Sequence, residues 1–284
     1  MPRSFKLLSM LIAALLVTVA CTALPSAPGE AVPASGTVDG ATTELVVFAA
    51  ASLTDAFGEI GTRFESANPG TTVVYNFGGS QQLAQQLGQG APADVFASAN
   101  ARQMEVAVES GRVISGTPRN FVHNRLVVIY PADNQAGIST LQDLTQPGLH
   151  LVLAAPEVPV GAYSLDFLNK AAATVEFGAT YSETVLSNVV SYEENVRSVL
   201  SKAVLGEADA GIVYTSDVFG DAAAQVGQID IPDALNTVAS YPLATVADSA
   251  YAELAAAFVD YVLGEQGQQI LADFGFVPIA SDEP

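Results

Sequence analysis

The sequence predicts an α/β protein whose sheets are mostly parallel. Short β-branched apolar runs alternate with segments in which apolar residues recur at the spacing of one helix face, and turns rich in glycine and proline separate them. The first unit is a strand over residues 44–48 followed by a helix over residues 53–64, which the turn Asn68-Pro69-Gly70 ends. Strands that alternate with helices at this rhythm favour parallel pairing over a β-sandwich.

The same alternation continues along the chain. Further strands are expected at residues 72–77, 94–97, 125–130, 149–154, 189–192, 210–217 and 241–246. Further helices are expected at residues 81–87, 101–109, 141–144, 163–168, 195–204, 254–262 and 270–274. This body of about 240 residues is long enough for one large domain or two modest ones.

Four of the expected helices start where a strand ends. Ser52 and Ser80 stand at the first two starts, the loop 156–163 opens the third, and Asn195 stands at the fourth. The first backbone N–H groups of a helix have no acceptor inside it and carry partial positive charge, so such starts can bind an anion. The simpler role of each serine is to cap its own helix; Ser52, with Asp55 three residues on, resembles a capping box.

Tyr214 stands near the end of the expected strand 210–217. A tyrosine there commonly lies at the edge of a core, with its hydroxyl hydrogen-bonded, and that is its simpler role. Together with the four helix starts, however, its hydroxyl gives donors from several sides, as a tetrahedral dianion requires. We expect neutral donors and helix dipoles, with no lysine or arginine at these starts, to form the site.

The N-terminal segment reads as a removable leader and a tether. Residues 1–20 carry two basic residues before a short apolar run, the pattern of a signal peptide. Cys21 is the only cysteine and follows small residues, so it resembles a lipidation site, although Thr18 stands where leucine is usual. The alternative is an ordinary cleavage site. Residues 21–43 are rich in small residues and proline and are expected to form a flexible linker.

Composition excludes several classes of function. The formal net charge is −20, with 30 acidic against 10 basic side chains, which excludes a nucleic-acid-binding surface and opposes any anion at long range. His123 and His150 lie in unrelated places, so the usual zinc and copper sites are not expected. No P-loop or dinucleotide-binding glycine motif follows a strand.

An enzyme is the alternative from another class. The segment around Ser80 lacks the second glycine of a serine-hydrolase elbow. A hydrolase that uses two carboxylates stays open, because acidic residues are plentiful. Asp55 and Glu194 are the nearest candidates, and a buried carboxylate beside Ser52 would favour that alternative. We expect both to serve helix starts instead.

Six segments together resemble the periplasmic molybdate-binding proteins of ABC transporters, a group of class II periplasmic solute-binding proteins. They are FAAASLTDAF (48–57), FGGSQQLAQQLGQGAPADVFASA (77–99), PEVPVGAY (156–163), ENVRSVL (194–200), GIVYTSD (211–217) and FGFVP (274–278). The resemblance implies an α/β fold with two lobes, mixed and mostly parallel sheets with flanking helices, and a two-strand hinge. It divides the body into lobe 1 (44–124 and 241–284) and lobe 2 (125–240).

The resemblance also implies the ligand-binding residues. Ser52 and Ser80 match two serines that donate through hydroxyl and backbone N–H groups, and Tyr214 matches a tyrosine that closes over the anion. Val160, where relatives often have alanine, and Val196 match backbone donors. One departure is Gly79, where relatives often carry another serine.

The implied function is capture of molybdate, and of tungstate with it, for delivery to an ABC transporter permease. The implied protein is a monomer outside the cytoplasm, in the periplasm or at the cell surface, lipid-anchored through Cys21, with no cofactor and no enzymatic activity. The alternatives that remain open are a receptor for sulfate, phosphate or ferric ion, and the carboxylate hydrolase. A ferric site usually needs paired tyrosines, whereas Tyr214 alone stands at the expected place.

Overall fold

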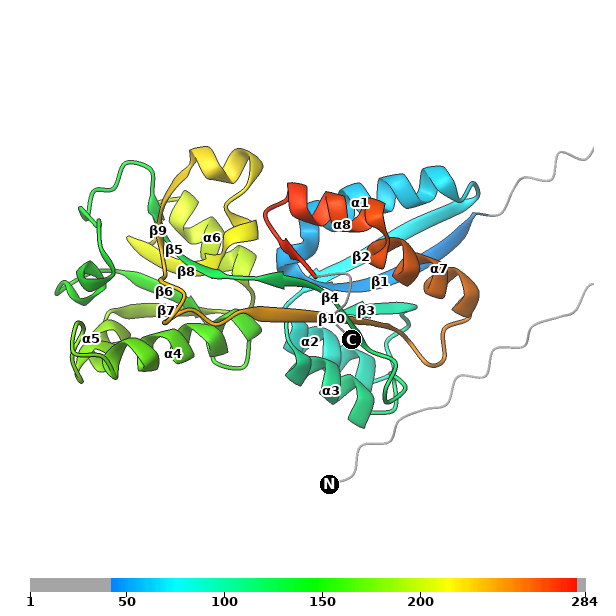
Figure 1. Ribbon diagram of the computed structural model, residues 1–284, viewed down its shortest axis with the longest axis horizontal. Coiled ribbons are helices and arrows are strands. Elements are labelled where there is room, and N and C mark those ends of the chain that lie inside the picture. The colour runs from blue at the N-terminus through cyan, green and yellow to red at the C-terminus, as the bar shows by residue number, and fades with distance from the viewer. Residues whose placement is uncertain (1–41, 280–284) are drawn as a thin grey trace, which may run out of the picture. The chain divides into compact units, whose positions relative to one another are not determined.

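The strands in residues 42–279, the part of the chain that the computed structural model describes, form two sheets (Figure 1). The first sheet has the strand order β11 (Val277–Pro278), β4 (Arg119–Asn124), β10 (Ala239–Thr245), β3 (Val95–Ala97), β1 (Thr43–Ala50) and β2 (Thr71–Gly78). The second has the order β7 (Val189–Glu193), β6 (Leu151–Ala154), β8 (Ala210–Tyr214), β5 (Leu126–Pro131) and β9 (Val226–Asp230). The expected signal peptide, Cys21 and nearly all of the expected linker lie outside the described residues.

Both sheets are mixed, which confirms the α/β class. Strand β1 pairs in parallel with β2 and β3, and β6 pairs in parallel with β7 and β8. The remaining pairings in the described part of the chain, which involve β4, β5, β9, β10 and β11, are antiparallel. Antiparallel pairing is therefore more extensive than the sequence pattern suggests, because the chain crosses between the sheets at β4–β5 and returns through β10.

Helices cover both faces of each sheet (Figure 1). On the first sheet, one face carries α1 (Thr54–Ala67), α7 (Ala252–Leu263) and α8 (Glu265–Asp273), and the other carries α2 (Ser80–Gly88) and α3 (Ala101–Glu109). On the second, α6 (Val196–Val204) covers one face, and α4 (Pro159–Ala172) and α5 (Tyr181–Ser187) cover the other. The short 3₁₀ turns are η1 (Ala51–Leu53), η2 (Leu141–Thr145), η3 (Thr215–Asp217) and η4 (Gly220–Ala224).

Aromatic packing fixes α1 against the first sheet. Phe57 and Phe64 are buried, and both rings contact Phe258 of α7, with ring centroids 6.1 and 5.2 Å apart. Phe57 also contacts Phe121 of β4 at 5.8 Å. Burial of each such ring stabilises the fold by about 1.5–3 kcal/mol. Because η1 leads directly into α1, this packing also holds the loop that carries Ser52.

The sequence pattern did not predict β4, β9, α5 and β11, and each omission has a physical reason. Strand β4 buries the consecutive residues Phe121 and Val122 and exposes Arg119 and Asn120, so it shows no alternation. Strand β9 is a partly exposed edge strand of mixed composition, and its backbone pairs with β5. Helix α5 and strand β11 are seven and two residues long, too short for a periodic signal.

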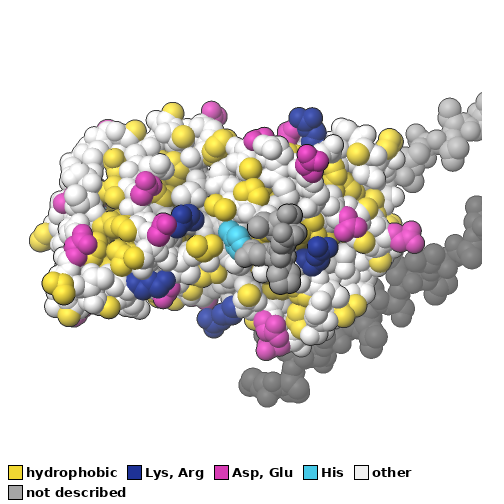
Figure 2. All heavy atoms as spheres, in the orientation of Figure 1, with side chains coloured by type: hydrophobic (Ala, Val, Ile, Leu, Met, Phe, Trp, Pro, Cys, Tyr) yellow, Lys and Arg dark blue, Asp and Glu magenta, His cyan; other side chains and the backbone are white. Residues whose placement is uncertain are grey.

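Within residues 42–279, none of the helices combines the length and the apolar character needed to span a bilayer. On the face shown in Figure 2, Lys and Arg side chains are scattered among Asp and Glu and form no continuous basic surface.

Candidate ligand-binding site

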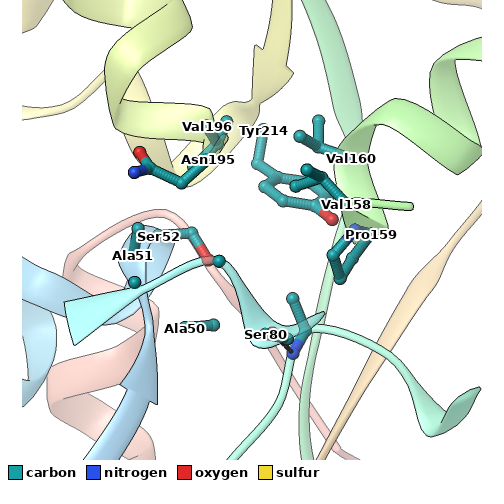
Figure 3. Close-up of a pocket in the computed structure, with 13 residues that line it drawn as sticks. Ala50, Ala51, Ser52, Ser80, Val158, Pro159, Val160, Asn195, Val196 and Tyr214 are labelled. Atoms are coloured by element: carbon teal, nitrogen blue, oxygen red, sulfur yellow. Dashed lines mark hydrogen bonds between the residues drawn. The ribbon is translucent and has the colours of Figure 1, made fainter. Parts of the chain in front are cut away.

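All five residues that the resemblance singles out line one small cavity (Figure 3). They are Ser52, Ser80, Val160, Val196 and Tyr214. The rest of its lining is Ala50, Ala51, Gly78, Gly79, Ala99, Val158, Pro159 and Asn195. Even with the open solvent at its mouth included, its empty space of about 210 Å³ is below the roughly 300–1,000 Å³ of common ligand pockets, so the cavity suits a ligand of few atoms.

The topology brings four helix starts to this cavity. Strands β1 and β2 are parallel neighbours and lead into η1 and α2, and the parallel neighbours β6 and β7 lead into α4 and α6. The carboxyl ends of parallel strands lie at one edge of a sheet, so the helix starts that follow them converge. Each sheet therefore supplies two starts.

The backbone donors at these starts are left for a ligand. The residues that precede η1, α2 and α4 make no side-chain capping bond. At α6, the Asn195 side chain accepts from the Ser198 amide at 3.0 Å, which confirms the expected cap and leaves the Val196 amide outside it. The first N–H groups of a helix have no acceptor inside it, so these amides direct partial positive charge at the cavity.

Ser52 does not form the capping box that its spacing suggests. It lies in η1, before α1 begins, and its Oγ lies 2.9 Å from the Tyr241 hydroxyl. The Asn124 amide donates to that same tyrosine oxygen at 3.3 Å. Tyr241 can therefore donate its own proton to Ser52, and the Ser52 proton is then available to an acceptor in the cavity. Asp55 does not cap α1 but forms an ion pair with Arg197, whose Nη2 lies 2.7 Å from Oδ2 of Asp55.

Ser80 is the first residue of α2, not its N-cap, which is Gly79. Its Oγ accepts from the Ala99 amide at 3.0 Å. A hydroxyl that accepts from the protein keeps its proton for another partner. Both serines are thus arranged as donors to the cavity.

The Tyr214 hydroxyl is buried and has no hydrogen-bond partner in the described part of the chain. In Figure 3 it points into the space between Ser52 and the start of α4. Burial, with a smaller contribution from Tyr241, holds its pKa well above the usual value, so the hydroxyl stays protonated. A buried donor without a partner costs about 1–3 kcal/mol, which a ligand that accepts from it would recover.

The described residues that line the cavity include no charged side chain. Asp55 pairs with Arg197, and the Glu194 carboxylate accepts from the Gln82 amide at 3.0 Å, so neither lies beside Ser52 in the cavity. No cluster of three metal-binding side chains occurs in residues 42–279.

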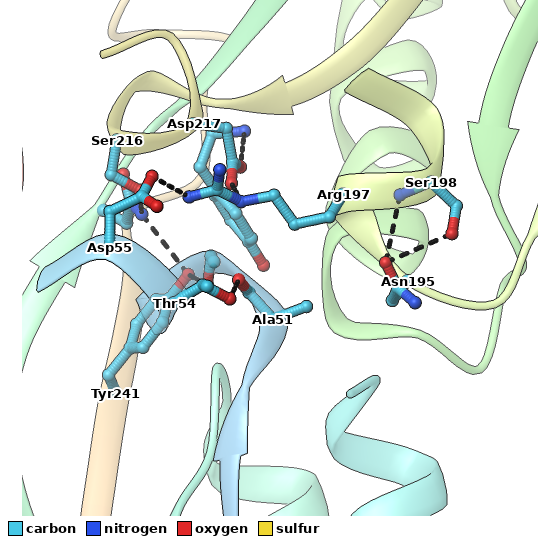
Figure 4. Close-up of polar contacts among 12 residues, drawn as sticks. Ala51, Thr54, Asp55, Asn195, Arg197, Ser198, Ser216, Asp217 and Tyr241 are labelled. Atoms are coloured by element: carbon cyan, nitrogen blue, oxygen red, sulfur yellow. Dashed lines mark hydrogen bonds and ion pairs between the residues drawn. The ribbon is translucent and has the colours of Figure 1, made fainter. Parts of the chain in front are cut away.

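Sequence reasoning missed the charged pair behind this cavity. Arg197 does stand in the first turn of α6, contrary to the expectation that no basic residue lies at these starts, but its side chain turns away from the cavity lining toward two carboxylates (Figure 4). Its Nε lies 3.0 Å from Oδ1 of Asp217, whose side chain is fully buried. Burial raises the pKa of Asp217 to about 6, although Arg197 acts in the opposite direction. The expected strand 210–217 ends at Tyr214, and the continuous apolar run of β8 gives no sign that Asp217, in the turn after it, pairs with Arg197.

The match to a family model decides the class of the protein. A model described as bacterial extracellular solute-binding protein matches residues 45–277. The chain belongs to this family. A relative in Mycobacterium tuberculosis (strain H37Rv), named Molybdate-binding protein ModA, is 39% identical over 268 residues, which cover 94% of this chain and 95% of the relative.

Solved structures of this family have the same fold. The substrate-binding domain of a putative molybdenum ABC transporter from Clostridium difficile is 29% identical, with a TM-score of 0.62, over 84% of this chain and 100% of that one. The sulfate-binding protein SubI from Mycobacterium tuberculosis H37Rv is 21% identical, with a TM-score of 0.73, over 84% of this chain and 88% of that one. At that identity the second likeness shows the fold alone.

The pKa of Asp217 predicts a pH dependence of stability. Its value of about 6 in the folded chain lies above the usual 3.8, so the folded state binds this proton more tightly than the unfolded state. The contribution is therefore present at low pH and is lost as the pH rises from about 4 to 6. Asp217→Asn should remove it, so the variant should gain stability relative to the unaltered chain across this range. Urea unfolding at pH 4, 5, 6 and 7 measures that difference, and a difference that stays constant with pH contradicts the prediction.

Proposed function

We propose that this chain is an extracytoplasmic solute-binding protein that captures molybdate, and tungstate with it, and delivers the anion to the permease of an ABC transporter. It catalyses no reaction and needs no cofactor. A lipid at Cys21 anchors a monomer to the membrane, in the periplasm or at the cell surface. The observation that carries the proposal is the buried Tyr214 hydroxyl, which has no hydrogen-bond partner among the described residues and borders a cavity together with four helix starts.

The donor set suits a small tetrahedral dianion. Three hydroxyl groups (Ser52, Ser80, Tyr214) and the backbone N–H groups of Ser52, Ser80, Val160 and Val196 surround the cavity. Hydrogen bonds to a charged partner contribute about 1.5–3 kcal/mol each. After the costs of desolvation and closure, such a set is compatible with the roughly 8–12 kcal/mol of micromolar to nanomolar binding.

The choice of molybdate rests on the relatives. The Mycobacterium tuberculosis relative carries the name of a molybdate-binding protein at 39% identity, and the Clostridium difficile structure comes from a molybdenum transporter. A sulfate-binding protein shares the fold, so the alternative is a receptor for sulfate or another tetrahedral oxyanion. Since all these anions need similar donors, the size of the cavity must distinguish them.

A hydrolase and a ferric-ion receptor find less support in the lining of the cavity. A carboxylate hydrolase needs acidic side chains there, and the described lining has none. A ferric site needs several anionic ligands, whereas Tyr214 is the tyrosine in this lining and its raised pKa disfavours the phenolate that iron binds.

Binding in this cavity requires the two halves of the body to close on the anion. We propose that residues 44–124 and 241–284 form one lobe, that residues 125–240 form the other, and that the segments crossing between the sheets form the hinge. The close approach of Gly79 to the other proposed lobe supports closure. A Cβ atom at Gly79 would come far too close to the Glu194 carbonyl oxygen, which belongs to the other lobe.

Calorimetric titration of the compact unit Gly40–Pro284 tests the function. Molybdate, tungstate, sulfate and phosphate are titrated in parallel. We expect tight 1:1 binding of molybdate and tungstate and no binding of the other two. Tight binding of sulfate or phosphate alone would establish the alternative receptor, and no binding of any anion would refute the oxyanion site.

Removal of one hydroxyl at a time tests the donors. Ser52→Ala and Tyr214→Phe should each weaken molybdate binding by about 1–3 kcal/mol, because each removes one donor to a charged ligand. Tyr163→Phe is the matched control, since Tyr163 is also largely buried, with a pKa raised to about 12 by burial, but does not line the cavity. Equal affinities for all three variants would argue against the assigned donors.

Gly79→Ala tests closure. The added methyl group should obstruct contact with Glu194 and so weaken anion binding by about 1–3 kcal/mol, the usual cost of overpacking. Gly79 has an ordinary extended backbone (φ −63°), so the stability of the anion-free chain should change little. Gly58→Ala, on the open face of α1, is the control and should leave binding unchanged. Normal binding by the Gly79→Ala variant would show that this contact is not part of the bound form.

A further inference from the structure

Arg197 joins the two halves of the body through two carboxylates (Figure 4). Its Nη2 lies 2.7 Å from Oδ2 of Asp55, and its Nε lies 3.0 Å from Oδ1 of Asp217. Asp55 belongs to α1, which packs on the first sheet, whereas Arg197 and Asp217 belong to α6 and η3, which accompany the second. The planar guanidinium group can contact both carboxylates at once, which a single ammonium group cannot do.

The pairing of Arg197 with Asp217 is also connected to residues that line the cavity. Asp217 accepts the Tyr214 amide through its other oxygen, at 3.1 Å. Arg197 directly follows Val196, whose amide faces the cavity. The path Asp55–Arg197–Asp217 therefore ends at the backbone of two proposed anion ligands, Tyr214 and Val196.

Burial separates the roles of the two carboxylates. The Asp217 side chain is fully buried, and its contact with Arg197 lies within one proposed lobe, so it does not require the lobes to close. Asp55 is 46% exposed and Arg197 26% exposed, so their contact can form and break at modest cost. The contact with Asp55 depends on closure, and the contact with Asp217 does not.

The positive charge of Arg197 also offsets the negative charge near the cavity. Without a cation, two carboxylates behind the cavity would repel an anion in a chain whose net charge is already −20. With Arg197 between them, the repulsion is largely offset, while the cation itself stays outside the cavity lining.

We propose that Arg197 is a positioning residue that locks the closed form: it binds Asp55 of the opposite lobe when the lobes close and, through Asp217, fixes the backbone of Tyr214 against the bound anion. This inference rests on the proposed function of the cavity as an oxyanion site. It assigns a share of the anion affinity to residues outside the cavity.

A double-mutant cycle on anion affinity tests the lock in the full chain. The first change is Asp55→Asn. The second is the pair Arg197→Gln with Asp217→Asn, which removes the buried charges together and leaves neither uncompensated. The side-chain amide that Asp217→Asn introduces keeps an oxygen that can accept the hydrogen bond from the Tyr214 backbone N–H. The cycle cancels the direct effect of removing a negative charge near the anion and isolates the coupling between Asp55 and Arg197.

We expect Asp55→Asn to lose roughly two- to fivefold more affinity in the unaltered chain than in the background that carries Arg197→Gln and Asp217→Asn, as a faster release of the anion. Glu59→Gln is the matched control, because Glu59 lies on the same helix and pairs with Arg63 of that helix at 2.7 Å. It should lose no affinity. An equal effect of Asp55→Asn in both backgrounds, with molybdate still bound, overturns the lock and leaves the proposed function standing.

Amide hydrogen exchange separates the lock from folding and from the choice of anion. With whichever of molybdate, tungstate, sulfate or phosphate the unaltered chain binds, Asp55→Asn should raise exchange at residues 193–200 and leave β5 and β9 unchanged. If the chain binds none of them, the proposed function fails. The lock rests on that function and then fails with it, whereas equal exchange in the two chains with anion bound overturns the lock alone.

Discussion

Everything at the candidate site depends on one constraint: a negatively charged ligand must be held without a cation in the cavity, inside a chain of net charge −20. Helix starts meet this constraint because their donors are part of the backbone and need no side chain of opposite charge. Parallel strands bring these helix starts close together, since they deliver consecutive starts to one edge of the sheet. The mixed sheets then set two such edges, from β1–β2 and from β6–β7, against one cavity.

Hydrogen bonds connect the segment that crosses between the sheets to that cavity. Asn124 ends β4 just before the chain enters the second sheet, and its amide donates to Ser216 at 2.8 Å and to Tyr241 at 3.3 Å. Tyr241 in turn holds Ser52. A change in the path of the chain at Asn124 would therefore reach Ser52 through two hydrogen bonds, so the proposed hinge and the first proposed donor are parts of one buried network.

Local pattern was enough to predict much of the fold. The runs that became β1, β2 and β6 are short and rich in apolar or β-branched residues, and α1 carries a helical periodicity. The turn signals at Gly70 and Gly206 stand just after the ends of their helices. The strands without such a pattern, β4 and β9, take their conformation from neighbours far along the chain, and no local signal marks them.

The candidate site divides in the same way. A serine at the junction of strand and helix is visible in the sequence, but the partner of Ser52 is 189 residues away, so its use of Tyr241 in place of a helix cap could not be foreseen. Val160 and Val196 line the cavity, and the backbone donors proposed for them leave no mark on side-chain identity, so only the resemblance singled them out. Arg197 and Asp217 are 20 positions apart and on different elements, and only the fold makes them neighbours.

The cavity also has a consequence for protonated ligands. The Ser80 oxygen already accepts from the Ala99 amide, the Asn195 side-chain oxygen accepts from the Ser198 amide, and the Ser52 oxygen shares one hydrogen with the Tyr241 hydroxyl. An anion that carries its own proton, as phosphate does near neutral pH, would bring a hydrogen that no carboxylate of the described lining could accept. A fully deprotonated dianion brings none. Besides the size of the cavity, a lining without a carboxylate among the described residues would therefore favour the fully deprotonated anion.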